Sequence, residues 1–171
     1  IDAHTASTGG INLADEYINR KKRFGYWKDT GIMLKGEAAW SFTLMFLQMW
    51  SVLSGQKQDY LKYRPHEWHQ EEFEDDGFVQ PYGDTPLDHE TVGENVYLNI
   101  INRAKKYIYI FTPYLVTDNE ITTALCLAAK SGIDVRIVTP GIPDKKLVFL
   151  LTQSYYDKLI QSGVRIFEYK P

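Results

Sequence analysis

The sequence lacks several features that mark common functional classes. It contains one cysteine, so it cannot close an intrachain disulfide. Its 19 Lys and Arg residues against 22 Asp and Glu give a formal net charge of -3, so there is no global attraction to nucleic acid. Gly-x-Gly-x-x-Gly and Gly-Lys-Ser/Thr, the phosphate-binding patterns of dinucleotide-binding and P-loop folds, are both missing. Any anionic ligand must therefore be held by a local site of another kind.

Long hydrophobic runs are also missing. The longest charge-free stretch, residues 38–56, is interrupted by Ser, Thr and Gln, and its dense apolar part is shorter than the ~20 residues of a membrane span. Its large apolar side chains recur three and four residues apart, which predicts a buried helix that faces the core. An alternative is that this stripe contacts lipid. The stripe consists of Phe42, Met45, Phe46, Met49 and Leu53, with Trp50 beside them.

The ends of the sequence lack an initiator Met and a signal-peptide pattern. Residues 1–2 are typical of the end of a strand, and residues 164–171 are typical of a strand followed at once by the last residue. We therefore expect a fragment of a longer protein.

The 171 residues are 44% hydrophobic, which is typical of a packed globular protein. The second half of the sequence has a regular pattern. Residues 107–111, 133–138 and 164–167 read as strands, separated by helices over about 118–131 and 144–162 and preceded by a helix over 90–106. Asp118 is the expected N-cap and Gly132 the expected C′ residue of one helix. This order of elements predicts two βαβ units with parallel strands, so the predicted class is α/β.

The strand ends and Cys126 give the first candidate features. Ligands of parallel sheets bind at the carboxyl ends of the strands, so residues 112–114 and 139–141 are candidate pocket lips. Cys126 stands among Ala and Leu in a helix, which favours a small buried hydrophobe over a reactive thiol.

The first half is less regular. Residues 1–55 predict a strand, a short helix, a strand and a long helix, with Asn12 and Gly36 at boundaries. Residues 56–77 have no periodicity and predict a linker, after which residues 78–80 predict a short strand. His66 and His69 have a spacing that could bind a metal on a helix, but solvated loop side chains explain them better. The basic run at residues 20–23, followed by aromatics, suits nucleic acid, an anionic lipid surface or a solvated helix end.

The motif that carries chemistry is near the amino terminus. Asp2, followed after six residues by Gly9-Gly10-Ile11-Asn12, resembles the second part of the phospholipase D signature His-x-Lys-x4-Asp-x6-Gly-[Gly/Ser]-x-Asn. Residues 9–19, 27–31, 35–40, 80–86 and 111–115 resemble the bacterial cardiolipin synthase family. The resemblance covers essentially the whole chain. It implies an incomplete phospholipase D-like α/β/α sandwich, with residues 1–55 ending one half, 56–77 linking, and 78–171 beginning the second half.

The resemblance also implies a function for the parent protein. It would be a phosphatidyltransferase of phospholipid biosynthesis that joins two phosphatidylglycerols and releases glycerol through a phosphohistidine, without cofactor or metal. Its partners would be phosphatidylglycerol and other anionic phospholipids at the bacterial cytoplasmic membrane, and not nucleic acid. Asp2 would orient the catalytic groups, Asn12 would donate to a phosphoryl oxygen, and Gly9 and Gly10 would admit the phosphate. In isolation, Asn12 could equally be a helix N-cap and the two glycines a turn.

No His-x-Lys pattern occurs in this sequence, and none of its four histidines, His4, His66, His69 and His89, occupies a signature position. We therefore expect this chain alone to be soluble and inactive. Two other functions fit the residues: a hydrolytic phospholipase D or nuclease of the same superfamily, and a non-catalytic anion-binding α/β module. Intact His and Lys signatures in the parent sequence would favour an enzyme over the binding module.

Overall fold

The computed structural model describes residues 2–66, 77–85 and 89–170. The chain forms two compact units: residues 1–17 with 28–84, and residues 18–27 with 85–171. His69 and the acidic run over residues 71–76 lie outside the described residues.

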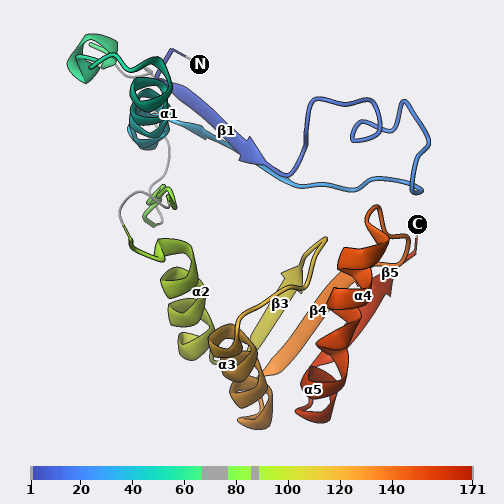
Figure 1. The fold of residues 1–171 in the computed structure, drawn as a ribbon. Coiled ribbons are helices and arrows are strands. Elements are labelled where there is room, and N and C mark those ends of the chain that lie inside the picture. Colours follow the sequence, from blue (N-terminus) through green and yellow to red (C-terminus); the bar gives the residue numbers. More distant parts are fainter. Residues whose placement is uncertain (1, 67–76, 86–88, 171) are drawn as a thin grey trace. The chain divides into compact units, whose positions relative to one another are not determined.

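The first unit is built on a two-stranded antiparallel pair and one long helix (Figure 1). Strand β1 (Thr5–Gly9) pairs with β2 (Gly31–Lys35) in a register that places Thr5 opposite Lys35 and Gly9 opposite Gly31. Helix α1 (Ala38–Ser54) follows and ends at Gly55, whose φ of 66° is left-handed. A 3-10 turn, η1 (Tyr60–Tyr63), then contacts α1. No helix in the described part of the chain is long and apolar enough to cross a membrane.

The expected core-facing stripe of α1 is wrong for its carboxyl-terminal half. Ala39 and Leu47 are buried, whereas Phe46, Met49 and Leu53 are 59%, 60% and 79% exposed. The physical reason is that a two-stranded pair offers too little surface to cover a wide apolar helix, so only the side that meets β1, β2 and η1 is covered.

Two other predicted elements of the first half are absent from the described residues. The segment from residue 11 to residue 30 contains turns but no helix, and residues 78–80 form no strand. In the segment from residue 11 to residue 30, the Asn19 side-chain amide forms two hydrogen bonds with the Trp27 backbone. Its Oδ1 accepts from the Trp27 N–H at 2.8 Å, and its Nδ2 donates to the Trp27 carbonyl at 2.9 Å. Such side-chain bonds to the backbone compete with helical bonds, which is why the local pattern did not become a helix.

The second unit contains the predicted parallel sheet. Strands β3 (Tyr107–Phe111), β4 (Asp134–Pro140) and β5 (Arg165–Tyr169) are hydrogen-bonded in that order, and both pairs are parallel. Helix α2 (Val92–Arg103) precedes the sheet, α3 (Asn119–Lys130) connects β3 to β4, and α4 (Lys146–Ser154) and α5 (Tyr156–Gln161) connect β4 to β5. The α/β class is thus confirmed. The single helix predicted over 144–162 is instead two helices that meet at Tyr155.

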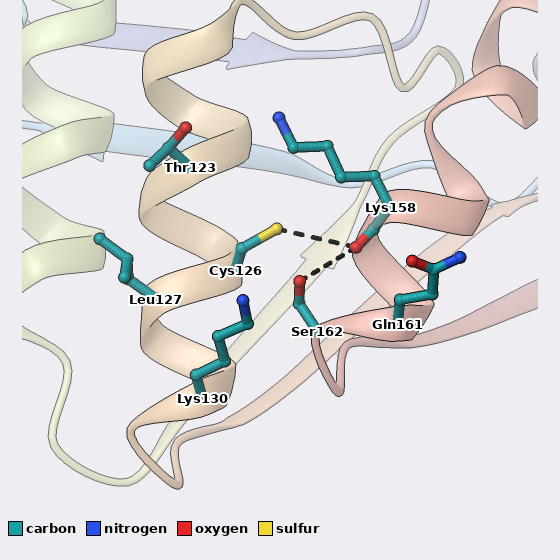
Figure 2. Close-up of a pocket in the computed structure, with 7 residues that line it drawn as sticks. All are labelled: Thr123, Cys126, Leu127, Lys130, Lys158, Gln161 and Ser162. Atoms are coloured by element: carbon teal, nitrogen blue, oxygen red, sulfur yellow. Dashed lines mark hydrogen bonds between the residues drawn. The ribbon is translucent and has the colours of Figure 1, made fainter.

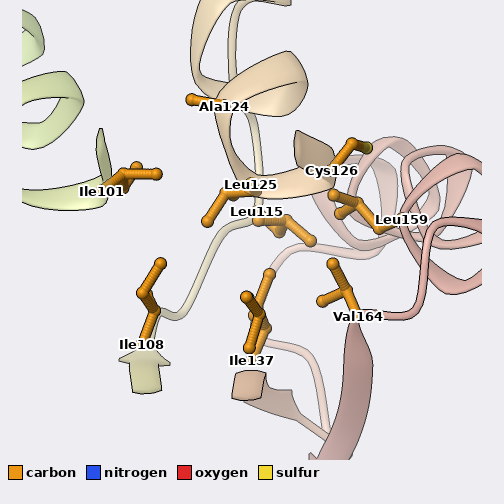
Figure 3. Close-up of a cluster of buried hydrophobic side chains, with 10 residues drawn as sticks. Ile101, Ile108, Leu115, Ala124, Leu125, Cys126, Ile137, Leu159 and Val164 are labelled. Carbon is orange, nitrogen blue, oxygen red and sulfur yellow. The ribbon is translucent and has the colours of Figure 1, made fainter. Parts of the chain in front are cut away.

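The caps of α3 are those expected from the sequence. The Asp118 Oδ1 accepts from the Ile121 N–H at 2.7 Å, and Gly132 follows the helix with a φ of 89°. The core of the unit lies between the helices and one face of the sheet (Figure 3). Val135 and Ile137 on β4 meet Leu125 of α3 and Leu159 of α5, all at most 1% exposed. Cys126 is 7% exposed in this cluster, which confirms its prediction as a buried hydrophobe.

Candidate functional site

The predicted site residues lie beyond the two ends of β1. Asp2 precedes the strand in a turn, exposed, with a left-handed φ of 54°, so the expectation that residue 2 ends a strand is wrong. Gly9, Gly10 and Asn12 stand at the other end of the strand. Five extended residues span about 13 Å at ~3.3 Å per residue. The structure therefore groups the glycines with Asn12 and places Asp2 at the opposite end of β1 (Figure 1).

Backbone packing requires glycine at the first of the two predicted positions. A Cβ on Gly9 would lie 2.7 Å from the Thr30 carbonyl oxygen and 2.9 Å from the Gly31 Cα. A Cβ on Gly10 would lie 2.8 Å from the Asp29 Oδ2. The atoms near Gly9 belong to the backbone, so the close approach of the two backbone segments explains that glycine. The atoms near Gly10 belong to the exposed Asp29 side chain, which can rotate away, so backbone packing does not explain Gly10. Contact with a phosphate at Gly9 and Gly10 stays a prediction.

Asn12 does not cap a helix. Its backbone carbonyl accepts from the Ala14 N–H at 2.9 Å in a turn, and its Nδ2 donates to the Tyr17 hydroxyl at 2.7 Å. An amide group carries two N–H hydrogens, so the bond to Tyr17 leaves one for another acceptor. The geometry holds the Asn12 side chain in place and is compatible with a second donor contact.

The carboxyl edge of the parallel sheet is closed by hydrogen bonds between its loops. After β3, the Tyr114 hydroxyl donates to the Asp144 Oδ2 at 2.5 Å, and the Lys145 Nζ lies 5.2 Å from the Tyr114 ring centre. After β4, the Gly141 N–H donates to the Tyr169 carbonyl at 2.7 Å. The two segments predicted as pocket lips therefore connect the loop after β3 to the loop after β4, and the loop after β4 to the last residue of β5.

A charged cluster on the sheet was not found by sequence reasoning. Tyr109, Arg136 and Arg165 occupy neighbouring positions on three strands. Asp134 accepts from all three: from the Tyr109 hydroxyl at 2.9 Å, from Arg136 Nη2 at 2.7 Å, and from Arg165. Hydrogen bonds from the two guanidinium groups hold the pKa of Asp134 well below its ordinary value, and the bond to Asp134 raises the pKa of Tyr109. The Asp-x-Arg alternation at residues 134–136 was the available sequence signal.

One acidic cluster in the described residues could offer oxygen ligands to a cation. Carboxylate oxygens of Glu94, Asp118 and Glu120 lie within 4.8 Å of one another. However, the Asp118 side chain caps α3, and Glu120 stands in the first turn of that helix, where the helix dipole favours negative charge. Local helix chemistry thus accounts for two of the three carboxylates. Of the histidines, His66 and His89 are exposed, and the His4 carbonyl accepts from the Gly36 N–H at 2.9 Å.

Comparison with known proteins relates this geometry to one family. Residues 97–171 match the family described as "Cardiolipin synthase, PLD-like domain". An uncharacterized protein of Streptococcus mutans is 54% identical over 100% of this chain and 36% of its own length. A cardiolipin synthase of Geobacillus kaustophilus is 39% identical over 99% of this chain and 34% of its own length, and cardiolipin synthase 2 of Bacillus cereus is 38% identical over 99% and 33%. No solved structure matches.

The chain spans about a third of the length of these curated relatives. The likeness to the named relatives extends over both compact units, and the parallel sheet of the second unit lies inside the matched domain. From the Asp2 and Gly9-Gly10-Ile11-Asn12 spacing, the parallel α/β sheet and these matches together, we conclude that the chain belongs to the cardiolipin synthase family of phospholipase D-like proteins.

Proposed function

We propose that the longer protein that contains this chain transfers a phosphatidyl group from one phosphatidylglycerol to another and releases glycerol. The observation that carries the proposal is the identity of about 39% between nearly the whole chain and proteins named cardiolipin synthase. Its substrates would be phosphatidylglycerol and other anionic phospholipids, at the bacterial cytoplasmic membrane. The proposal does not include nucleic acid as a partner.

The proposed chemistry proceeds in two displacements at one phosphorus atom. A signature histidine attacks the phosphate of the donor lipid, the bond to glycerol breaks, and a second histidine protonates the departing glycerol oxygen. That second histidine then takes the proton from the incoming hydroxyl of another phosphatidylglycerol, whose oxygen displaces the first histidine. This sequence contains no His-x-Lys pattern, so neither histidine is among its 171 residues.

Within this chain, the proposal gives Asn12 the role of a neutral donor to a phosphoryl oxygen. Its amide is held by Tyr17 and keeps one hydrogen for the substrate. A donor aimed at an oxygen that gains charge in the transition state lowers the barrier without changing its own charge. Asp2 would orient a catalytic histidine. Its carboxylate has no hydrogen-bond partner within residues 2–66, 77–85 and 89–170, so it is available to a group supplied by the longer protein.

The test is product analysis with vesicles of phosphatidylglycerol. The longer protein should convert them to cardiolipin and glycerol, whereas the 171-residue chain alone should release no glycerol. Glycerol together with phosphatidic acid, and no cardiolipin, would mean that water is the acceptor and that the protein is a hydrolase. No turnover of phosphatidylglycerol by the longer protein would refute the proposal, and glycerol release by the chain alone would place the nucleophile among its residues.

A further inference from the structure

A groove lies between α3 and α5 of the second unit. Four of its lining residues, Thr123, Cys126, Leu127 and Lys130, recur on α3 at spacings of three and four, so they share one face of that helix. Lys158 and Gln161 of α5, with Ser162 just after it, form the opposite wall (Figure 2). The groove has a volume of about 380 Å³, and Thr123 and Lys130 stand about 10 Å apart along α3.

The two lysines are the only charged side chains among the residues that line this groove. The backbone carbonyl of Lys158 already accepts two hydrogen bonds from residues that line the groove. These come from the Ser162 hydroxyl at 3.0 Å and from the Cys126 thiol at 3.9 Å, as the dashed lines of Figure 2 show. Lys158 extends its side chain toward the Thr123 end of the groove, and Lys130 enters from the other end (Figure 2). The nearest acidic group in sequence, Asp157, accepts from the Gln161 amide at 2.8 Å.

Both lysine ammonium groups lack an ion pair or hydrogen bond among the residues that the structure describes. Lys130 stands in the last turn of α3, where the helix dipole favours positive charge, but its ammonium group is not needed to satisfy the last carbonyls of that helix. The N–H groups of Ser131, Gly132 and Ile133 donate to the last carbonyls of that helix at 2.9 to 3.1 Å. Two positive charges thus border one groove whose walls carry hydroxyl groups.

We propose that the groove between α3 and α5 binds a phosphate-bearing anion through the ammonium groups of Lys130 and Lys158. A phosphate group has several oxygens and can accept from two ammonium groups at once, and lysine binds it as a point charge. Leu127 offers an apolar surface for the organic part of a phosphate ester. None of Asp2, Gly9, Gly10 and Asn12 lines this groove, so the inference does not depend on the proposed phosphatidyl transfer. Free phosphate and a lipid headgroup share the chemistry that the groove recognises.

The first experiment titrates the 171-residue chain, labelled with nitrogen-15, with inorganic phosphate and follows the amide resonances. Saturable shifts should occur at Cys126, Leu127, Lys130 and Ser162. Shifts that are absent, that do not saturate, or that occur only elsewhere would overturn the proposal, and this result needs no variant.

The second experiment compares variants of equal charge change. Lys130→Gln with Lys158→Gln should weaken phosphate binding at least about fivefold per lysine removed, since ~1 kcal/mol of attraction at 4 Å in water corresponds to that ratio. The control pair, Lys105→Gln with Lys146→Gln, removes two exposed lysines that do not line the groove and should leave binding near normal. Lys130→Arg with Lys158→Arg should retain binding. Equal weakening by both glutamine pairs would show a general charge effect and refute the site.

The third experiment distinguishes the two ligand sources. If the ligand is a lipid headgroup, the chain should sediment with phosphatidylglycerol vesicles but not with phosphatidylcholine vesicles, and the Lys130→Gln, Lys158→Gln pair should abolish the difference. If the ligand is free phosphate, phosphate should bind while both kinds of vesicle leave the chain in solution. Vesicle binding that survives the double substitution would contradict a headgroup site in this groove.

Discussion

A single buried hydroxyl should decide how firmly the loop after β3 is held. Thr152 of α4 is 1% exposed, and its Oγ1 accepts from the N–H of Leu115, itself 3% exposed, at 3.0 Å. Thr152→Val keeps the volume of the side chain but removes the acceptor, so the Leu115 N–H would be buried without its partner. Such a loss costs about 1–3 kcal/mol, and the additional buried methyl group returns at most ~0.8 kcal/mol. We expect the second unit to lose roughly 1–2 kcal/mol of stability.

Amide hydrogen exchange measures this effect in the second unit by itself. The free energy of opening at Val135 and Ile137 on β4 reports the stability of the core, and the Leu115 amide reports the hydrogen bond directly. Thr152→Ser is the matched control, because it keeps the acceptor and removes only a methyl group. The Leu115 amide should exchange faster in Thr152→Val than in Thr152→Ser at equal core stability. Wild-type protection of Leu115 in Thr152→Val, with unchanged core stability, would refute the reasoning.

Three further predictions follow from particular contacts. Gly9→Ala should destabilise the first unit by about 1–3 kcal/mol in denaturant titration, because the new Cβ meets the Thr30 carbonyl oxygen at 2.7 Å. Gly77→Ala should not, because its new Cβ meets no atom of the described residues within 4 Å, and equal effects of the two substitutions would contradict this. Asp134→Asn should lower the stability of the second unit at neutral pH. Because the pKa of Asp134 lies below its ordinary value of 3.8, the charged carboxylate stabilises the fold at pH values above 3.8, and this stability is lost as the pH falls below that value. The melting temperatures of wild type and Asp134→Asn should therefore converge in acid. In the longer protein, Asn12→Asp should keep the bond to Tyr17, with the Tyr17 hydroxyl now donating, but reduce cardiolipin formation about 10²–10³-fold. The exposed Asn99→Asp gives the same charge change and serves as the control. Near-normal turnover by the Asn12→Asp protein would remove Asn12 from the proposed chemistry.

The second unit could be predicted from local patterns because its elements are specified locally. Asp118 and Gly132 fix the ends of α3 through bonds to their own neighbours, and the two-residue alternation of β4 separates its inner from its outer side chains. Parallel pairing then followed from the strand, helix and strand order, and both strand pairs confirm it. The division of α4 from α5 at Tyr155 was not visible, because the apolar pattern continues across it.

The first half of the sequence shows where local patterns are insufficient. The apolar spacing in α1 correctly indicated a helix, but it could not tell which side would be covered, because covering depends on what packs there. The short helix expected after Asn12 gave way to turns in which side chains of Asn12 and Asn19 form hydrogen bonds along the loop. The strand expected at residues 78–80 is absent from the described structure, since a short apolar run alone does not supply a pairing partner.

The sequence by itself determined the order of elements in the second unit, the spacing of Asp2 with Gly9-Gly10-Ile11-Asn12, and the family likeness, because all three are carried by residues close together in the chain. Only the tertiary structure decided that Asp134 meets Arg165, that Gly9 and Gly10 lie against residues 29–31, and that Lys130 and Lys158 border one groove. These contacts join residues between 19 and 31 positions apart. Strand register and helix packing set them, and neither is encoded in the local periodicity of a single element.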